Sequence, residues 1–301
     1  MVSVLVFGGD GWIGKQLVAL LQNHQKIDMV FVSNVRPQHL QALREELDVM
    51  KPSHVISTIG RTHGKIDGVE IPTIDYLEYD GKLMENVTDN LYAPLTLAHE
   101  CERRDIHYTY LGTGCIFEYD NTHSIGSEQK FLENDEPNFF GSSYSIIKGI
   151  TDQLMHQFPH SVLNVRIRMP ITTMPNPRDF ITKILNYKKI CSMDNSMTVL
   201  DELLPLLIEM ILSYKTGTIH LTNPGTISHD EILTLYKQIV DSSKTWETMT
   251  YEEQSLLLKS KRSNNELDTT TLQRLFPNVR SIRDAVTAIL INRRNNMQVR
   301  D

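Results

Sequence analysis

The sequence predicts an α/β fold, in which a doubly wound parallel sheet is joined by a smaller C-terminal lobe. Short apolar runs rich in β-branched residues alternate with stretches of helical periodicity, and such alternation implies a parallel sheet with helices on both faces. A glycine-rich turn follows the first run, and the pattern of strand-like and helical stretches changes after Pro170. We therefore expect residues 1–170 to form the sheet domain, with later contributions around 196–222, and residues 171–301 to form mainly the second lobe.

Each expected element follows from a local pattern. In the first helix, for example, Ile13, Leu17 and Leu21 recur at helical spacing. Strands are expected at 2–7, 29–33, 54–59, 107–111, 162–167 and 218–221. Helices are expected at 12–22, 37–49, 81–104, 142–158, 180–187 and 200–214, and the tail from residue 228 is expected to be helical and polar.

The composition is that of an ordinary globular chain, with 40% hydrophobic and 22% charged residues among 301. A net charge of −7 argues against a nucleic-acid partner, which requires a basic surface. Three widely spaced cysteines and the absence of CxxC and HExxH motifs indicate neither a disulfide framework nor a bound metal. No signal peptide and no apolar stretch approaching the roughly 20 residues of a membrane span is visible. We therefore expect a cytoplasmic protein without a membrane partner.

A glycine-rich turn lies between the first expected strand and the first helix. Gly8, Gly11 and Gly14 form G-x-x-G-x-x-G, with Trp12 and Ile13 inside the motif. Such a turn lets the backbone approach a diphosphate, whose charge then faces the positive end of the helix. The alternative is a tight turn with no ligand. The position of the motif favours a Rossmann-type sheet that binds a dinucleotide at these five residues.

The end of the second expected strand bears on which dinucleotide binds. Enzymes that use NAD usually place an acid there, but this segment has none. Ser33 and Arg36 could instead hold a 2′-phosphate, and the sequence therefore predicts NADPH, although Arg36 could also be a solvated surface residue. Thr58 and Gly60, after the third strand, are expected beside the cofactor. Asn90 is a further candidate, with a purely structural role as the alternative.

A Tyr-x-x-x-Lys pattern, Tyr144 and Lys148, lies on an expected helix, where residues four apart share one face. A nearby ammonium should lower the phenol pKa from its usual value of ~10, which suits proton exchange with a carbonyl oxygen. Thr113, at the end of the fourth expected strand, offers a hydroxyl to the same oxygen. The three resemble the Ser/Thr–Tyr–Lys triad of the short-chain dehydrogenases/reductases, with Tyr144 as proton donor while NADPH supplies hydride.

Cys115 lies two residues beyond Thr113 and adds a second chemistry. A lone cysteine is more often an inert buried residue. A 4-ketone, however, acidifies the hydrogens on both neighbouring carbons, and inverting those carbons needs one group on each face of the ring. Thiol and amine groups suit this if their pKa values of ~8.5 and ~10.4 move toward neutrality. Lys183 is a candidate partner, but the residues alone do not establish the pairing.

Four segments resemble a more specific family. They are 112–120 (GTGCIFEYD), 176–183 (NPRDFITK), 195–205 (NSMTVLDELLP) and 262–268 (RSNNELD). They are similar to bifunctional UDP-4-keto-6-deoxyglucose 3,5-epimerase/4-reductases, which complete plant-type UDP-L-rhamnose synthesis and have homologues in large DNA viruses. A viral chain would work in the host cytoplasm. The loop at 123–131 has less glycine than is expected of the plant enzymes.

The resemblance implies a reaction in two steps. UDP-4-keto-6-deoxy-D-glucose, made by a separate 4,6-dehydratase, is epimerised at C3 and C5, and NADPH then reduces C4 to give UDP-β-L-rhamnose. The family's acid/base pair maps onto Cys115 and Lys183, with Cys115 taken as base and Lys183 as acid. Its triad maps onto Thr113, Tyr144 and Lys148. Because no dehydratase segment precedes the motif, UDP-glucose itself is not the expected substrate.

Candidates for substrate binding lie in the C-terminal lobe. Arg262 is the preferred diphosphate partner because a guanidinium binds phosphate oxygens in a bidentate manner. Arg178 is expected near the nucleotide, and Asn195, Asn223 and Asn265 near uridine or sugar hydroxyls. Helix caps and turns are the alternative roles for the three asparagines.

Two rival functions remain open at this stage. One is a monofunctional NADPH-dependent 4-keto-sugar-nucleotide reductase of the dTDP-rhamnose type, which would not need Cys115 and Lys183. The other is a non-catalytic Rossmann subunit, against which the intact Tyr144 and Lys148 argue. A homodimer is common among similar enzymes, while the sequence decides neither the oligomeric state nor the tolerance for dTDP.

Overall fold

The computed structural model describes residues 1–298, which divide into two compact units. Unit 1 comprises Met1–Ile116, Phe139–Arg166 and Leu204–Ile219, and unit 2 comprises Phe117–Asn138, Ile167–Leu203 and the residues from His220 onward. Both units are therefore assembled from separate stretches of sequence. Within the described part of the chain, no helix is long and apolar enough to cross a membrane.

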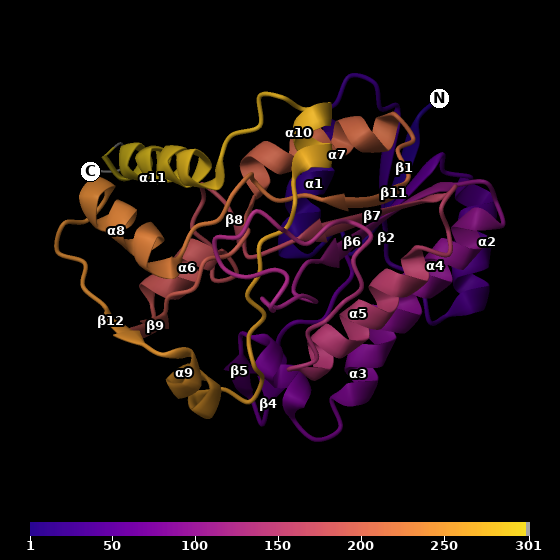
Figure 1. Cartoon of the computed structure of the whole chain (residues 1–301). Helices are drawn as coiled ribbons and strands as arrows, with labels where there is room; N and C mark the ends of the chain where they lie inside the picture. Colours follow the sequence, from indigo (N-terminus) through magenta and orange to yellow (C-terminus); the bar gives the residue numbers. More distant parts are fainter. Residues whose placement is uncertain (299–301) are drawn as a thin grey trace. The chain divides into compact units, whose positions relative to one another are not determined.

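Unit 1 contains a six-stranded sheet within residues 1–298, with the order β11-β7-β6-β3-β1-β2 (Figure 1). Its strands are β1 (Ser3–Phe7), β2 (Met29–Ser33), β3 (His54–Ser57), β6 (His107–Thr113), β7 (Val162–Ile167) and β11 (Gly217–His220). The pairs β1/β2, β1/β3 and β3/β6 are parallel. The expected doubly wound parallel sheet is confirmed, and the chain reverses direction across the sheet between β1 and β3.

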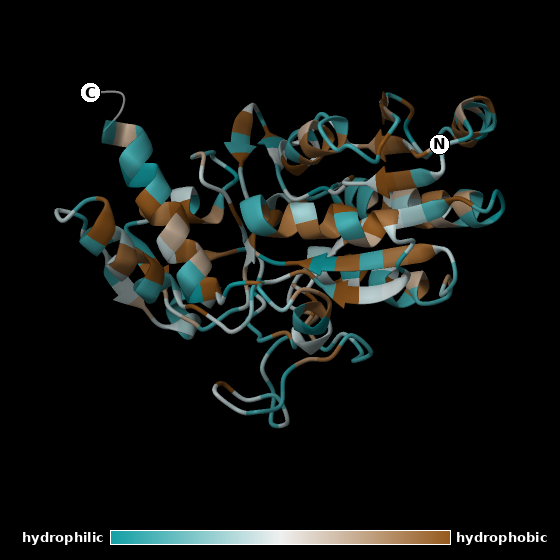
Figure 2. Cartoon of the chain, turned by 90° about the horizontal axis from the view of Figure 1, so that it is seen from above, coloured by the Kyte–Doolittle hydropathy of each residue, from teal (hydrophilic) through white to brown (hydrophobic). Residues whose placement is uncertain are grey.

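Helices cover both faces of this sheet. They are α1 (Trp12–Gln22), α2 (Leu40–Met50), α3 (Leu83–Val87), α4 (Ala93–Glu102), α5 (Ser143–Met155) and α7 (Leu200–Leu212). One core joins β1, β3 and β6 to α2, α4 and α5 through fully buried residues such as Leu5, Leu47 and Leu97. The helices carry hydrophobic and hydrophilic bands (Figure 2), as amphipathic helices packed on a sheet should.

The single helix expected at 81–104 is divided in the structure. A π-helical segment, η2 (Thr88–Tyr92), separates α3 from α4. Pro94 has no N–H, so it cannot donate to the carbonyl of Asn90 four residues earlier. That carbonyl instead accepts the hydroxyl of Thr151 at 2.6 Å, from α5. The π-helical turn therefore coincides with a side-chain replacement for a missing backbone bond.

A short hairpin and a 3-10 turn precede α3 and were not expected from the sequence. Strands β4 (Gly64–Ile66) and β5 (Val69–Ile71) pair antiparallel, and η1 (Ile74–Glu78) follows. Asp67 and Gly68 both have positive φ, of 48° and 80°, as a type I′ hairpin turn requires. The Asp-Gly pair was the local signal for this hairpin.

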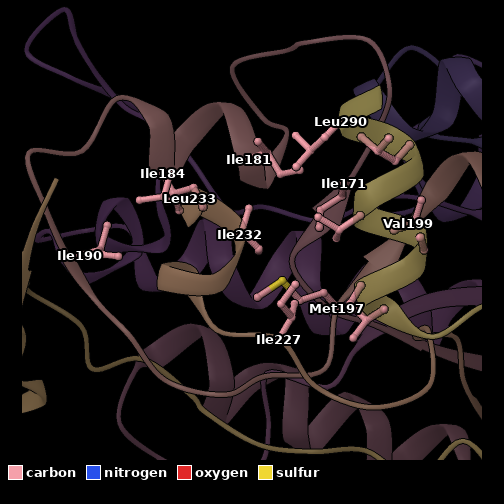
Figure 3. Packing of buried hydrophobic residues seen from close by; sticks show 14 residues of the cluster. Ile171, Ile181, Ile184, Ile190, Met197, Val199, Ile227, Ile232, Leu233 and Leu290 are labelled. Carbon is pink, nitrogen blue, oxygen red and sulfur yellow. The ribbon is translucent and has the colours of Figure 1, made fainter. Parts of the chain in front are cut away.

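The described residues of unit 2 form two small parallel pairs of strands and several helices. Strand β8 (Pro170–Ile171) pairs with β10 (Thr198–Val199), and β9 (Lys189–Cys191) pairs with β12 (Glu247–Met249). The helices are α6 (Phe180–Leu185), α8 (His229–Ile239), α9 (Tyr251–Leu257), α10 (Thr270–Leu275) and α11 (Ile282–Gln298). Figure 3 shows the core of this unit, where Ile181, Ile232 and Leu290 bring α6, α8 and α11 together.

Candidate active site

The carboxyl ends of β1 and β3 define the candidate cofactor site. Neighbouring parallel strands whose connections leave in opposite directions open a space for ligands at this edge. Gly8 follows β1 and Thr58 follows β3, and the Thr58 hydroxyl donates to the Gly8 carbonyl at 2.9 Å. The structure therefore brings these two residues, expected at the cofactor, together.

The glycine turn has the properties that a diphosphate requires. Gly8 has a φ of +78°, and a Cβ on Gly14 would overlap the Gly8 carbonyl oxygen. Helix α1 begins at Trp12, followed by Ile13, with no side chain capping its N-terminus and no acid in its first turn. Free N–H groups and the positive end of the helix thus remain available for an anion. The residues present fit a dinucleotide.

The end of β2 differs from the expectation in one respect. The buried Ser33 hydroxyl donates to the carboxylate of Glu46 at 2.7 Å and accepts the N–H of Val35. Glu46 lies on α2, thirteen residues further on, so the sequence around β2 gave no sign of this acid. Arg36 is exposed. Ser33 is thus already bonded to protein groups, whereas Arg36 is exposed at the end of β2.

Asn90 shapes the loop after β3 rather than presenting a free amide. Its side-chain oxygen accepts the N–H of Arg61 at 3.0 Å, and its nitrogen donates to the Arg61 carbonyl and to Asn86. Gly60 lies beside this amide, where a Cβ would approach the Asn90 oxygen to 3.4 Å. Asn90 is completely buried. Asn90 therefore lies next to the candidate cofactor site and contacts it through the backbone of residues 60 and 61.

Tyr144, Lys148 and Thr113 gather where β6 ends and α5 begins. The Ser142 hydroxyl caps α5, and this places Tyr144 in the first helical turn and Lys148 one turn further on. Burial raises the pKa of the Tyr144 phenol, and the nearby Cys115 raises it further, while a hydrogen bond with Thr113 opposes both. We expected a lowered pKa for Tyr144. The structure instead keeps this phenol protonated, because desolvation disfavours the phenolate.

Lys148 is buried on the same helix. Burial lowers its pKa to about 8, while the charges of Asp152 and Cys115 act in the opposite direction. Its ammonium donates to the phenol oxygen of Tyr110 at 2.5 Å and lies 4.6 Å from the centre of that ring. Tyr110 is on β6 and was not among the residues that the sequence indicated.

Cys115 is half-buried just beyond β6, beside an apolar wall. Tyr76, Leu77 and Tyr144 form a buried cluster. The partly buried side chains packed against it are Ile66, Ile71, Ile74 and Cys115. The thiol and the phenol thus share one cluster, whose other members come from the β4–β5 hairpin and η1. Sequence reasoning missed this wall because its residues carry no catalytic motif.

Lys183 lies on α6 of unit 2. Burial lowers the pKa of its ammonium, and the positive charges of Arg178 and Arg262 lower it further, against the opposing effect of Asp179. The charges of Arg178 and Arg262 are therefore close enough to act on Lys183 within unit 2. A diphosphate would relieve their repulsion, which fits the expected nucleotide. Arg262 also donates to Ser260.

The three candidate asparagines hold unit 2 together. Asn195 accepts Arg168 at 2.7 Å and the N–H of Asn265 at 3.1 Å, and the Asn265 amide donates to the Phe117 carbonyl at 2.8 Å. Asn223 accepts the N–H of Val199 at 2.9 Å. All three are completely buried. Their contacts are those of loop-organising amides, and their role toward a ligand stays a prediction.

Helix α6 is fixed by a buried ion pair. Asp179 caps the helix by accepting the Thr182 N–H at 2.7 Å, and Arg293 of α11 donates to the same carboxylate at 2.7 Å. Both side chains are almost completely buried. We expect Arg293→Met to lower the free energy of unfolding by about 3–5 kcal/mol, because it leaves a buried carboxylate without its cation.

Urea denaturation of both variants at one protein concentration would measure this loss. The neighbouring Arg294 is exposed, so Arg294→Met should change stability by less than about 0.5 kcal/mol. Equal stability of the two variants would show that the pair does not support α6.

A known protein family matches more than half of the chain. The model of the NAD dependent epimerase/dehydratase family matches residues 4–186. The chain belongs to this family. As a member of the NAD dependent epimerase/dehydratase family, it is an enzyme that uses a nicotinamide dinucleotide. In the described residues, no group of three or more His, Cys, Asp and Glu could hold a metal ion.

Three relatives show a more specific similarity. The L780 UDP-rhamnose synthase of Acanthamoeba polyphaga mimivirus, known from a crystal structure, is 50% identical in sequence to this chain. The two structures match with a TM-score of 0.91, over 96% of this chain and 99% of that one. A bifunctional dTDP-4-dehydrorhamnose 3,5-epimerase/reductase of Arabidopsis thaliana is 40% identical over 99% of this chain and 95% of its own length. A trifunctional Arabidopsis enzyme with 4,6-dehydratase, 3,5-epimerase and reductase activities is 40% identical, but only 41% of its length is matched.

Proposed function

We propose that the enzyme converts UDP-4-keto-6-deoxy-D-glucose into UDP-β-L-rhamnose, by 3,5-epimerisation and then by reduction of the C4 ketone. Relatives named for both activities match this chain over 95–99% of its length, and a UDP-rhamnose synthase matches it over 96%. The observation that carries the proposal is the cluster that holds Tyr144 and Cys115. A phenol for the ketone oxygen and a thiol for a neighbouring carbon can thus meet one sugar ring. A separate 4,6-dehydratase would supply the substrate.

In the reduction, residues of unit 1 transfer one proton to the ketone oxygen. A nicotinamide cofactor, when bound at the glycine turn, would supply hydride for C4. Tyr144 gives its phenolic proton to the C4 oxygen, and Thr113, which hydrogen-bonds the phenol, orients it. The Lys148 ammonium, one turn along α5, would stabilise the phenolate that remains and would hold the cofactor ribose. The raised pKa of Tyr144 keeps the proton in place until the ketone takes it.

In the epimerisation, Cys115 and Lys183 exchange protons with C3 and C5. One group removes a proton next to the ketone, and the other returns a proton to the opposite face of the carbon. We assign Cys115 as the base and Lys183 as the acid. Burial and two neighbouring arginines lower the Lys183 pKa, and a lowered pKa makes an ammonium a better proton donor near neutrality.

The experiment that tests this function uses UDP-4-keto-6-deoxy-D-glucose, NADPH and the whole chain in D₂O, with the product identified by NMR. Two-step conversion gives UDP-β-L-rhamnose with deuterium at C3 and C5. A monofunctional reductase of the dTDP-rhamnose type would leave C3 and C5 without deuterium and would oxidise NADPH only after a 3,5-epimerase is added. Absence of NADPH oxidation even with the added epimerase would favour the non-catalytic alternative.

The cofactor proposed here is NADPH, on the grounds that Arg36 is exposed at the end of β2. We expect Arg36→Met to lower kcat/KM for NADPH about tenfold or more and to leave kcat/KM for NADH within about twofold, because only NADPH carries the 2′-phosphate. Glu46→Gln should have the opposite sign, since it removes a negative charge near that phosphate. A wild-type preference for NADH would contradict the assignment.

A further inference from the structure

Tyr110 and Lys148 form a contact that the reaction proposed above does not use. Tyr110 belongs to β6, three residues before Thr113, and its side chain is buried. Lys148 donates to its phenol oxygen, and the ammonium also lies over the ring at 4.6 Å. Gly112 provides room for this arrangement, since a Cβ there would approach a Tyr110 ring carbon to 3.2 Å.

A buried ammonium is costly unless polar groups surround it. The charge of Asp152, on the same helix, favours the ammonium, but the Asp152 oxygens accept hydrogen bonds from Arg166 at 2.5 Å and 2.9 Å and from Asn164 at 2.8 Å. Cys115 also acts on Lys148 through its charge, and Tyr144 lies four residues earlier on the same helix. The phenol of Tyr110, by its lone pair and its ring face, therefore supplies the direct contact to the ammonium.

We infer that Tyr110 is a positioning residue, which holds the Lys148 ammonium charged and in place before the cofactor arrives. This role rests on the proposed function of Lys148 toward the cofactor ribose. Burial also raises the pKa of Tyr110 well above its usual value, so the phenol stays neutral and does not exchange protons with substrate. It acts only through Lys148.

The test measures binding of NADPH to the whole chain without sugar, by isothermal titration between pH 6 and pH 9. Because Lys148 has a pKa of about 8, affinity in the wild type should weaken as the pH rises through that value. Tyr110→Phe keeps the ring but removes the oxygen, so this transition should move about one pH unit lower. The dissociation constant should then be about fivefold higher than wild type at pH 8 and within twofold of it at pH 6.5.

Tyr108→Phe is the matched control. Tyr108 is equally buried two residues earlier on β6, but its phenol lies beside Ser57 and Cys101. The affinity of the Tyr108→Phe variant for NADPH should depend on pH in the same way as that of the wild type. A Tyr110→Phe curve that coincides with the control, or an affinity loss equal at every pH, would overturn the inference. Neither outcome depends on the sugar reaction, so a failure here is distinct from a failure of the proposed function.

Discussion

Replacing Tyr144 with phenylalanine will abolish reduction while sparing epimerisation. The loss of a general acid should lower the rate of NADPH oxidation with the keto-sugar by about 10²–10⁴-fold. Cys115 and Lys183 are unchanged, so exchange of solvent deuterium into C3 and C5 should continue. Stopped-flow absorbance at the nicotinamide band and NMR of the recovered keto-sugar measure the two steps separately.

Tyr92→Phe is a suitable control for that experiment, because Tyr92 is an exposed phenol in the same unit. It should retain both activities. An equal loss of reduction and exchange in Tyr144→Phe would mean that one acid serves both steps, and the division of roles would have to be abandoned.

Replacing Cys115 with serine will have the reverse effect. A serine hydroxyl preserves the size of the group but is too weak an acid to leave a useful base near neutral pH. We therefore expect exchange of deuterium at C3 and C5 to fall by about 10²–10⁴-fold. Reduction of the ketone that is already epimerised should proceed within a few fold of the wild-type rate, because Tyr144 and Lys148 remain.

Cys101→Ser provides the comparison for the second experiment. Cys101 is a completely buried residue of α4, and burial raises the pKa of its thiol, so it cannot act as a base near neutrality. The Cys101→Ser variant should keep both activities even if its stability is lower than that of the wild type. If Cys115→Ser still exchanges deuterium at the wild-type rate, the thiol is not the base and the monofunctional reductase gains support.

Local patterns predicted the parts of this molecule that local physics determines. The strand–glycine turn–helix unit at Gly8 to Gly14 and the spacing of Tyr144 and Lys148 depend on neighbours within a few residues, and their elements lie where the periodicity placed them. The fold class followed from the same alternation of short strands and helices.

Contacts between distant residues could not be predicted in this way. Glu46 reaches Ser33 only because α2 packs against the sheet, and Tyr110 meets Lys148 only through the packing of α5 on β6. The apolar wall at Tyr76 depends on a hairpin whose single signal was Asp67-Gly68. The raised pKa of Tyr144 likewise depends on how deeply the phenol is buried, which residue spacing does not reveal.

Unit 1 is built from stretches that lie far apart in the sequence, and this has a consequence for synthesis on the ribosome. The edge strand β11 completes the sheet of unit 1, and it is made about fifty residues after β7. Until then the growing chain presents an unpaired edge on β7, and open strand edges favour association with other chains. A chain stopped near residue 170 would keep that edge permanently, so shortened forms made to isolate the dinucleotide half should aggregate unless residues 204–220 are supplied as a second fragment.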